Sequence, residues 1–146
     1  LAELARAATS PVTVRALVRS ARAADSIRAL ALSPAPEIRI VDYGDPAAMT
    51  CALEGATAVV HLVGIIKETR DTRYADAHES TCAALAAAAA RTGIERIVYL
   101  SILGSEPAST NPCLASKGRA EAILLAGSVD ATILRVPMVI GADDHA

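Results

Sequence analysis

The sequence lacks three features that would each point to a particular class of protein. No block of lysine and arginine occurs, and the formal net charge is −2, which argues against nucleic acid as the main partner. No apolar run reaches the roughly 18 residues that a membrane-spanning helix needs. Cys51, Cys82 and Cys113 are widely spaced and form no CxxC pair, which argues against a zinc site and favours a reduced, cytoplasmic setting.

The chain does contain enough apolar residues to build one buried core. It has 146 residues, of which 53% are hydrophobic and 21% are charged, as is typical of a single globular domain. Leu1 already lies in a helix-like pattern, and the last residues follow directly on a strand-like run. We therefore expect residues 1–146 to be part of a domain that is truncated at both ends.

Short β-branched runs alternate along the chain with stretches rich in alanine and leucine. The strand-like runs cover residues 12–18, 37–42, 56–64, 96–102 and 131–140. The helix-like stretches cover residues 1–8, 23–32, 46–54, 71–92 and 114–126. Asp45 is expected to cap the third helix ahead of Pro46, and Gly93 is expected as the C′ residue of the fourth. Apolar strands separated by helices predict an α/β fold with a doubly wound, mostly parallel sheet covered on both sides.

Sheets of this kind bind ligands at the carboxyl ends of their strands. Arg19 follows the first strand-like run, with Arg22 nearby and no acid. This pattern favours the 2′-phosphate of NADP over the free ribose of NAD, and a solvated arginine is the simpler alternative. Asp42 ends the second run, where its carboxylate could accept a hydrogen bond from an adenine amino group.

The third strand-like run ends in a glycine, which would let a flat ligand approach the backbone. The candidates for binding a cofactor at the ends of the third and last strands are Leu62, Val63, Gly64, Val136 and Pro137. His61 lies inside the apolar run, and we interpret it as a core residue.

Five stretches occur in an order that is similar to the short-chain dehydrogenase/reductase superfamily, in its extended and atypical branches. They are VDYGDPAAM, GATAVVHLVG, RIVYLSILG, SKGRAEAIL and ILRVPMVIG. The sequence most resembles the group that includes the NAD(P)H-binding accessory subunit of respiratory complex I, NmrA-like proteins and NAD-dependent epimerases and dehydratases. The resemblance implies a Rossmann-like domain that binds NADP or NAD, with NADP favoured.

The resemblance also shows what this sequence does not contain. Members of the superfamily begin with a strand and a glycine-rich GxxGxxG turn, whose backbone amides hold the pyrophosphate. Neither occurs here, and residues 1–8 resemble the helix that follows that turn. The expected strand order is 3-2-x-4-5-6 in the superfamily's numbering, where x is the strand that is absent.

The resemblance assigns roles around the start of the last helix. In active members, a tyrosine four residues before a lysine acts as general acid or base, and the lysine lowers the pKa of that phenol and binds the nicotinamide ribose. Lys117 matches the lysine, whereas Cys113 occupies the tyrosine position. The partner serine falls on Ser101 or Ile102, and the alignment favours Ile102. Near a helix N-terminus and one turn from Lys117, the thiol of Cys113 could have a lowered pKa and substitute for the phenol. It is shorter than tyrosine, however, so we interpret the site as one that has lost its acid.

Two functions stay open. The first is a protein that binds NAD(P)(H), is weakly active or inactive, and has a structural or redox-sensing role, with a protein partner or a homodimer possible. The second is an active NAD(P)-dependent oxidoreductase, epimerase or dehydratase that acts on an unknown small molecule. A flavodoxin-like receiver domain is excluded because the sequence has no acidic phospho-acceptor cluster.

Overall fold

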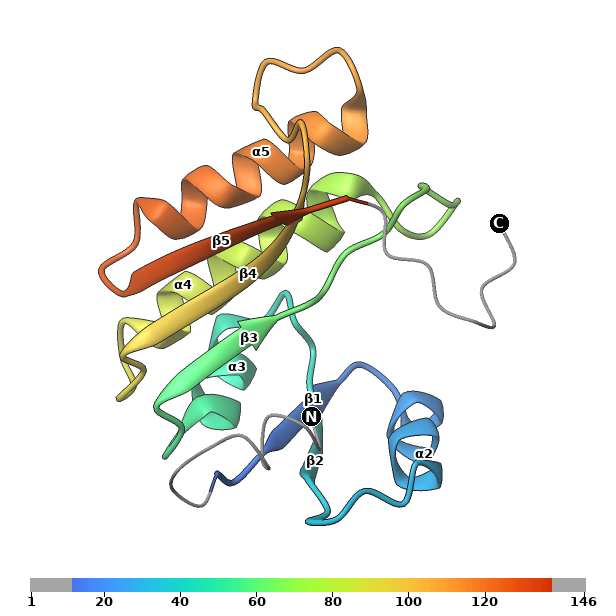
Figure 1. Cartoon of the computed structure of the whole chain (residues 1–146), viewed down its shortest axis with the longest axis vertical. Helices are drawn as coiled ribbons and strands as arrows, with labels where there is room; N and C mark the ends of the chain where they lie inside the picture. The colour runs from blue at the N-terminus through green and yellow to red at the C-terminus, as the bar shows by residue number, and fades with distance from the viewer. Residues whose placement is uncertain (1–11, 138–146) are drawn as a thin grey trace. The chain divides into compact units, whose positions relative to one another are not determined.

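The computed structural model describes residues 12–137, and in this range the chain forms two compact units (Figure 1). The first unit ends at Tyr43 and the second begins at Gly44. The helix predicted for residues 1–8 and the end of the last predicted strand lie outside the described residues.

In its described residues the first unit has two parallel strands joined by a helix. Its elements are β1 (Arg15–Val18), α2 (Ala21–Ala29) and β2 (Glu37–Ile40). Val18 pairs with Ile40 at the carboxyl ends of the two strands. The helix begins two residues earlier than predicted because Ser20 caps it: the serine hydroxyl accepts a hydrogen bond from the Ala23 N–H at 3.2 Å.

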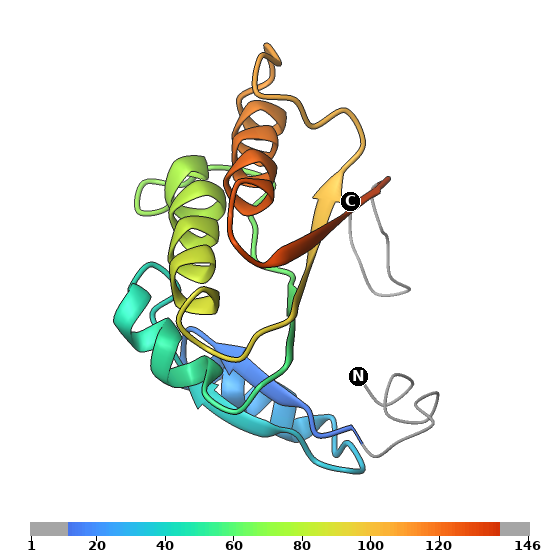
Figure 2. The ribbon, with the colours of Figure 1, turned by 90° about the vertical axis from the view of Figure 1, so that its left-hand side faces the viewer.

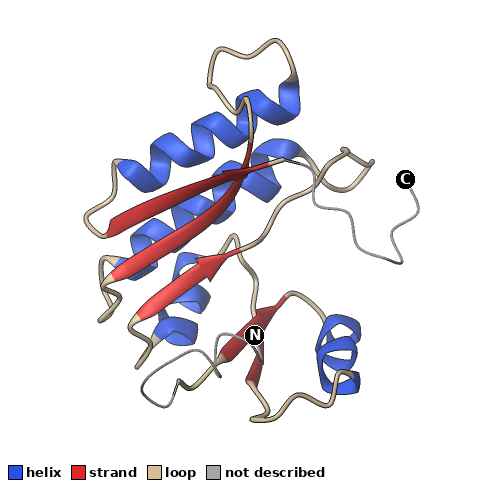
Figure 3. Cartoon of the chain, in the orientation of Figure 1, coloured by secondary structure: helices blue, strands red, loops and turns tan. Residues whose placement is uncertain are grey.

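The second unit contains a three-stranded parallel sheet with the order β3-β4-β5 (Figure 3). The strands are β3 (Ala58–His61), β4 (Arg96–Ile102) and β5 (Asp130–Val136). The central strand β4 has the predicted bounds, whereas β3 is shorter than predicted at both ends. His61 pairs with Tyr99, and Tyr99 pairs with Ile133 on its other side.

The described helices of the second unit lie on one face of this sheet (Figure 2). They are α3 (Pro46–Leu53), the π-helix η1 (Ala75–Ser80), α4 (Thr81–Ala89) and α5 (Pro112–Leu125). Alternate residues of β4, namely Ile97, Tyr99 and Ser101, are buried beneath the helices. On the opposite face Val60 and Leu134 are 56% and 47% exposed. Coverage of that second face stays a prediction.

The parallel strand pairs confirm the predicted α/β class and the predicted order within each unit. β1 and β2 match strands 2 and 3 of the expected order, and β3, β4 and β5 match strands 4, 5 and 6. Among the described residues no ladder joins the two sheets. The placement of the two units in one continuous sheet stays a prediction.

The single helix predicted for residues 71–92 is wrong at both ends. The carboxylate of Glu68 accepts a hydrogen bond from the Tyr74 N–H at 2.8 Å and closes a loop, so helical backbone begins only at Tyr74. The first turns are π-helical, and α-helix follows as far as Ala89. The helix therefore ends well before Gly93, which is not its C′ residue.

Polar caps fix the starts of α3 and α5. The predicted cap at Asp45 is confirmed, since its carboxylate accepts a hydrogen bond from the Ala47 N–H at 2.8 Å. In α5 the Asn111 side chain accepts a hydrogen bond from the Cys113 N–H at 2.9 Å. This helix therefore begins at Pro112, two residues before the predicted start, and Cys113 lies in its first turn.

Gly118 allows α5 to pass close to the loop that follows β4. A Cβ on Gly118 would lie 2.4 Å from the carbonyl carbon of Glu106 and 2.5 Å from the nitrogen of Pro107. Both are backbone atoms, so neither can rotate away, and a side chain would force the helix and the loop apart. The contact holds the turn of α5 next to Lys117 against the loop.

We expect Gly118→Ala to lower the free energy of unfolding by about 1–3 kcal/mol, the usual cost of overpacking. Helix propensity alone predicts the opposite sign, a gain of about 1 kcal/mol for alanine in a helix. Gly93→Ala is the matched control, because a Cβ there has no neighbour within 4 Å. Urea denaturation of both variants decides between the two effects, and a Gly118→Ala protein as stable as the control would contradict the close contact.

Candidate functional site

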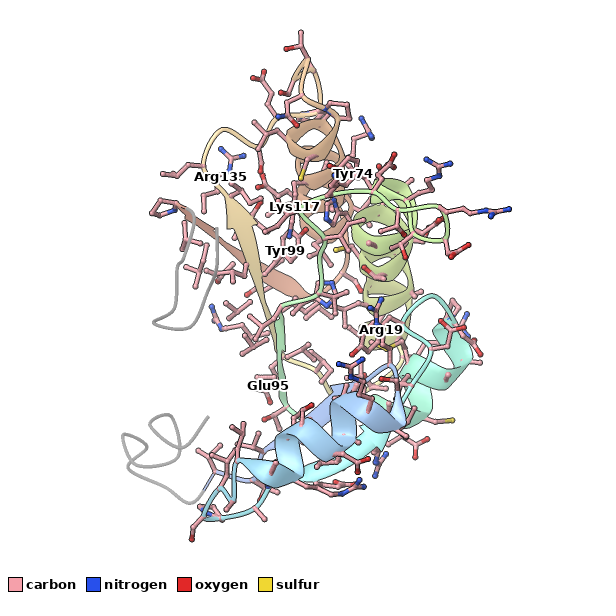
Figure 4. All side chains as sticks on the ribbon, turned by 90° about the vertical axis from the view of Figure 1, so that its right-hand side faces the viewer. Arg19, Tyr74, Glu95, Tyr99, Lys117 and Arg135 are labelled. Carbon is pink, nitrogen blue, oxygen red and sulfur yellow. The ribbon has the colours of Figure 1, made fainter. Side chains whose placement is uncertain are left out.

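Polar side chains gather around Lys117 at the carboxyl ends of β3 and β4 (Figure 4). Lys117 is only 6% exposed. Its ammonium donates a hydrogen bond to the Leu100 carbonyl at 3.0 Å and lies 4.5 Å from the centroid of the Tyr99 ring. Burial lowers the pKa of Lys117, while neighbouring thiols and a carboxylate act in the opposite direction. The lysine that the sequence singled out is thus a buried cation on an aromatic face.

Residues 64–66, which we call the strand-exit segment, follow β3 and face this cation. A Cβ on Gly64 would lie 3.1 Å from Lys117 Nζ and 3.4 Å from His78 Nε2. The next residue, Ile65, donates its N–H to His78 Nε2 at 3.1 Å. The missing side chain at Gly64 therefore makes room for the lysine of the same chain, in addition to leaving its own backbone exposed.

Cys113 lies one helical turn before Lys117 and contacts the same segment. Its thiol donates to the Ile65 carbonyl, with 3.7 Å between sulfur and oxygen. Burial raises the pKa of Cys113, and the charge of Lys117 opposes this only in part. The thiol is therefore protonated at neutral pH, and the lowered pKa that the sequence allowed for is not found.

Ser101 and Ile102, the two candidates for the partner serine, lie on opposite faces of β4. Ser101 is 1% exposed and shares the helix-covered face with Tyr99. Its hydroxyl donates to the Ser105 hydroxyl at 3.2 Å. Ile102 is half-buried on the other face. The only hydroxyl of this pair thus lies on the side of the sheet from which Lys117 reaches β4, and a role in catalysis for either residue stays a prediction.

The candidates for the adenosine end lie in the first unit. Arg19 directly follows β1, and its side chain is exposed. Asp42 follows β2 and is also exposed. Beside them, the Tyr43 hydroxyl donates to the Leu17 carbonyl at 2.9 Å, and burial raises the pKa of Tyr43 while the charge of Arg19 opposes the shift. Arg19 and Asp42 both lie at the carboxyl edge of the two-stranded sheet, as predicted.

The remaining cofactor candidates lie at the carboxyl edge of the three-stranded sheet. Leu62 is exposed and Val63 half-buried just after β3. Val136 is the last residue of β5 and is half-buried, and Pro137 follows it and is exposed. Their positions agree with the prediction, and their contacts with a cofactor stay predictions.

Two buried histidines lie close to Lys117. His61 stacks on Tyr99 with ring centroids 5.5 Å apart, and burial, followed by the charges of Lys117 and His78, lowers its pKa to about 4. His78 is fully buried, and burial together with Lys117 lowers its pKa to about 4 as well. Both rings are therefore neutral at physiological pH. The core interpretation of His61 agrees with its position.

Sequence reasoning missed Tyr74 and His78. The Tyr74 hydroxyl donates to the Ile66 carbonyl at 2.8 Å, and its ring stacks on His78 with centroids 5.6 Å apart. The sequence carries a signal for this pair, because residues four apart on one helix share a face. The helix predicted for residues 71–92 contained both residues, so their spacing was available from the sequence, whereas their contacts with Ile65 and Ile66 were not.

Residues 12–137 contain no group of three or more histidine, cysteine, aspartate or glutamate side chains arranged to hold a metal ion. Within the same range, none of the helices combines the length and the apolar character needed to cross a bilayer.

Comparison with known proteins identifies the family. Residues 1–145 match the family described as NAD(P)H-binding. The chain belongs to this NAD(P)H-binding family. It is 32% identical over 105 residues to the mitochondrial NADH dehydrogenase [ubiquinone] 1 alpha subcomplex subunit 9 of Arabidopsis thaliana, a match that covers 71% of this chain and 26% of the plant protein. This agrees with the resemblance found in the sequence.

Two solved structures show the same Rossmann-like fold. An NADPH-dependent quinone oxidoreductase from Escherichia coli has a TM-score of 0.61 and 24% identity, over 88% of this chain and 39% of its own. A nucleoside-diphosphate-sugar epimerase from Staphylococcus aureus has a TM-score of 0.64 and 16% identity, over 85% of this chain and 50% of its own. The chain therefore spans half or less of the length of these relatives.

The depressed histidine pKa values predict how the stability of this domain depends on pH. A histidine with a lowered pKa contributes stability that is fully present above its unfolded pKa of 6.5 and is lost as pH falls toward about 4. We expect the free energy of unfolding to fall between pH 6.5 and 4.5 by up to about 1.4 kcal/mol per pH unit for each histidine. Denaturation midpoints at pH 4.5 to 8 measure this.

The variant His61→Phe, which keeps a ring against Tyr99 but cannot titrate, should remove part of the slope. The carboxylates of Glu37 and Glu79 have lowered pKa values, so their contribution to stability is lost only below about pH 4.5. They therefore do not add to the slope between pH 6.5 and 4.5. A stability that stays flat from pH 6.5 to 4.5 would show that neither histidine is buried as described.

Proposed function

We propose that this NAD(P)-binding domain prefers NADP(H), is weakly active or inactive as an oxidoreductase, and has a structural or redox-sensing role. The observation that carries the proposal is the pair on α5: Lys117 is kept at the carboxyl edge of the sheet, while the position one turn earlier holds the protonated thiol of Cys113. The Lys117 ammonium is a group for binding, and the Cys113 thiol is a poor substitute for a catalytic phenol.

The residues around Lys117 fit the ribose end of a dinucleotide. An ammonium has three N–H donors, and the Leu100 carbonyl takes one of them. Gly64 has no side chain and is exposed, so its backbone is open to a flat ring. A bound NAD(P)H would supply hydride, and the chain itself would orient the cofactor through Lys117 and the strand-exit segment.

The protonation states around Lys117 support weak or absent proton transfer. General acid–base catalysis is most efficient when the pKa of the group lies near the working pH. Here the pKa values of His61 and His78 are lowered to about 4, and that of Cys82 is raised to about 12. Burial also raises the pKa values of Tyr99 and Cys113. These five groups keep their protonation states across the neutral range.

The second candidate function, an active NAD(P)-dependent oxidoreductase, epimerase or dehydratase, is favoured by one observation. Burial moves the pKa of Lys117 downward, toward the range in which an amine can exchange protons. A lysine in this state could take over the proton transfer of the missing phenol.

The setting of the domain is also a proposal. The plant relative is described as a subunit of NADH dehydrogenase, and a protein partner or a second copy of the chain would suit a structural role here too. That relative is described as mitochondrial, so the cytoplasmic location expected from the cysteines stays a prediction.

Calorimetry and cofactor oxidation on the full-length protein test the proposed function. We expect submillimolar binding of NADPH, little turnover at the nicotinamide absorbance band with quinone and aldehyde acceptors, and no change in turnover on Cys113→Ala. Lys117→Met should weaken binding about tenfold without lowering stability, because removing a buried charge relieves its desolvation cost. Rapid turnover that disappears on Cys113→Ala would establish a catalytic thiol and favour the second candidate.

Arg19 gives a separate test of cofactor choice. A guanidinium can pair with a 2′-phosphate through two hydrogen bonds, so we expect Arg19→Asp in the full-length protein to weaken NADPH binding at least tenfold and to spare NADH. Arg28→Asp is the matched control, since it makes the same charge change at the far end of α2, where Arg28 pairs with Asp25. Equal effects of the two variants on the ratio of NADPH to NADH affinity would rule out Arg19.

A further inference from the structure

Side chains from two helices lie against the strand-exit segment at each of its three residues. Lys117 Nζ lies against Gly64, where a Cβ would be 3.1 Å away. His78 Nε2 receives the Ile65 N–H at 3.1 Å. The Tyr74 hydroxyl donates to the next carbonyl, that of Ile66, at 2.8 Å. At Ile65 and Ile66 the backbone that leaves β3 is therefore held by hydrogen bonds and does not depend on packing alone.

Tyr74 and His78 act as one unit. They are four residues apart on one helical stretch, and their rings stack with an interplanar angle of 25°. The π-helical turn between them is a local widening of the helix, a feature that is frequent at functional sites. Both side chains come from this helix, and both contact the strand-exit segment, which faces Lys117.

The helix that carries the pair is itself tied to α5. Glu79, next to His78, accepts two hydrogen bonds from the Arg119 guanidinium, both at 2.9 Å, and a third from the Ser116 hydroxyl at 2.8 Å. Ser116 and Arg119 flank Lys117 on α5. The helix that carries Tyr74 and His78 is therefore tied to α5, which carries Lys117. The contacts to Ile65 and Ile66 and the position of the Lys117 ammonium depend on the same two helices.

We propose that His78 and Tyr74 are positioning residues for the nicotinamide half of the dinucleotide: they hold residues 64–66 so that the exposed backbone of Gly64 lies beside the Lys117 ammonium. This rests on the function proposed above, in which the cofactor binds at the carboxyl edge of β3 and β4. Neither residue is assigned a part in the chemistry.

The chemistry of His78 fits this role better than that of an apolar residue. Its Nε2 lies 3.1 Å from the Ile65 nitrogen and 3.2 Å from the Ile65 oxygen, so it can accept from the N–H when neutral. Without it, the Ile65 N–H would lose this partner, and the segment could turn to find another. The lowered pKa keeps the ring neutral, which leaves Nε2 able to accept at physiological pH.

The test compares four variants of the full-length protein by calorimetry and thermal denaturation. The probes are NADPH and 2′,5′-ADP, which carries only the adenosine half. His78→Leu removes the contact to Ile65, and Tyr74→Phe keeps the stacked ring but removes the hydroxyl. His78→Gln places an amide near the position of Nε2 and is the conservative rescue. Leu85→Ala, a truncation of a fully buried side chain in α4, is the control for lost stability.

We expect His78→Leu to weaken NADPH binding about tenfold and Tyr74→Phe about threefold, with 2′,5′-ADP binding unchanged in both. His78→Gln should stay within threefold of the unmodified protein. Leu85→Ala should lose thermal stability and keep its affinity for NADPH. If His78→Leu does not fold, the NADPH affinity of Tyr74→Phe still tests the proposal, because this variant loses only a single hydroxyl.

Three results would overturn the proposal. NADPH affinity within twofold of normal in both His78→Leu and Tyr74→Phe would show that the segment needs no such support, while the proposed function would stand. Equal losses for NADPH and 2′,5′-ADP would show a general structural effect. No binding of NADPH or NADH by the unmodified protein would remove the proposed function and this inference together.

Discussion

The buried ammonium of Lys117 is the constraint on which the rest of the site depends. Burying an isolated charge is costly, so its surroundings must stabilise it. The Leu100 carbonyl, the face of the Tyr99 ring and the nearby Glu121 carboxylate do this. The charge in turn disfavours a second cation close by, which is one reason why His78 stays neutral and can accept a hydrogen bond from the strand-exit segment.

The Lys117 ammonium can stay in place only if α5 does, and three sets of contacts hold this helix. Arg119 and its neighbour Ser116 bond to Glu79 on the π-helix. Glu121, which is 3% exposed, receives Arg135 of β5, with Nε 3.1 Å from its carboxylate. The third tie is the close backbone contact that Gly118 permits with the loop after β4. Only Glu121 is buried in these ion pairs, and losing Arg135 would leave its carboxylate without that partner, so this tie in particular resists movement of the helix.

The parts of the fold that depend on local sequence were predictable. The strand β4 has the predicted bounds because most of its residues are apolar or β-branched, and the start of α3 follows from the Asp45 cap. The helix after β3 was mispredicted because its start depends on Glu68, a residue in a loop that binds the Tyr74 N–H from six positions away. Helix propensity contains no term for such a contact.

The site shows a different limit of sequence reasoning. Similarity to a family pointed to Lys117 and Cys113, and the glycine that ends the third strand-like run pointed to Gly64. The protonation state of a side chain, however, depends on its burial in the folded structure. The sequence allowed Cys113 a lowered pKa from its helix start and its lysine, yet burial raises it. The same burial that holds Lys117 against the Tyr99 ring therefore also moves the pKa values of His61, His78 and Cys113 away from neutrality. These shifted pKa values are the basis of our proposal that the domain binds NAD(P)H and is weakly active or inactive in reduction.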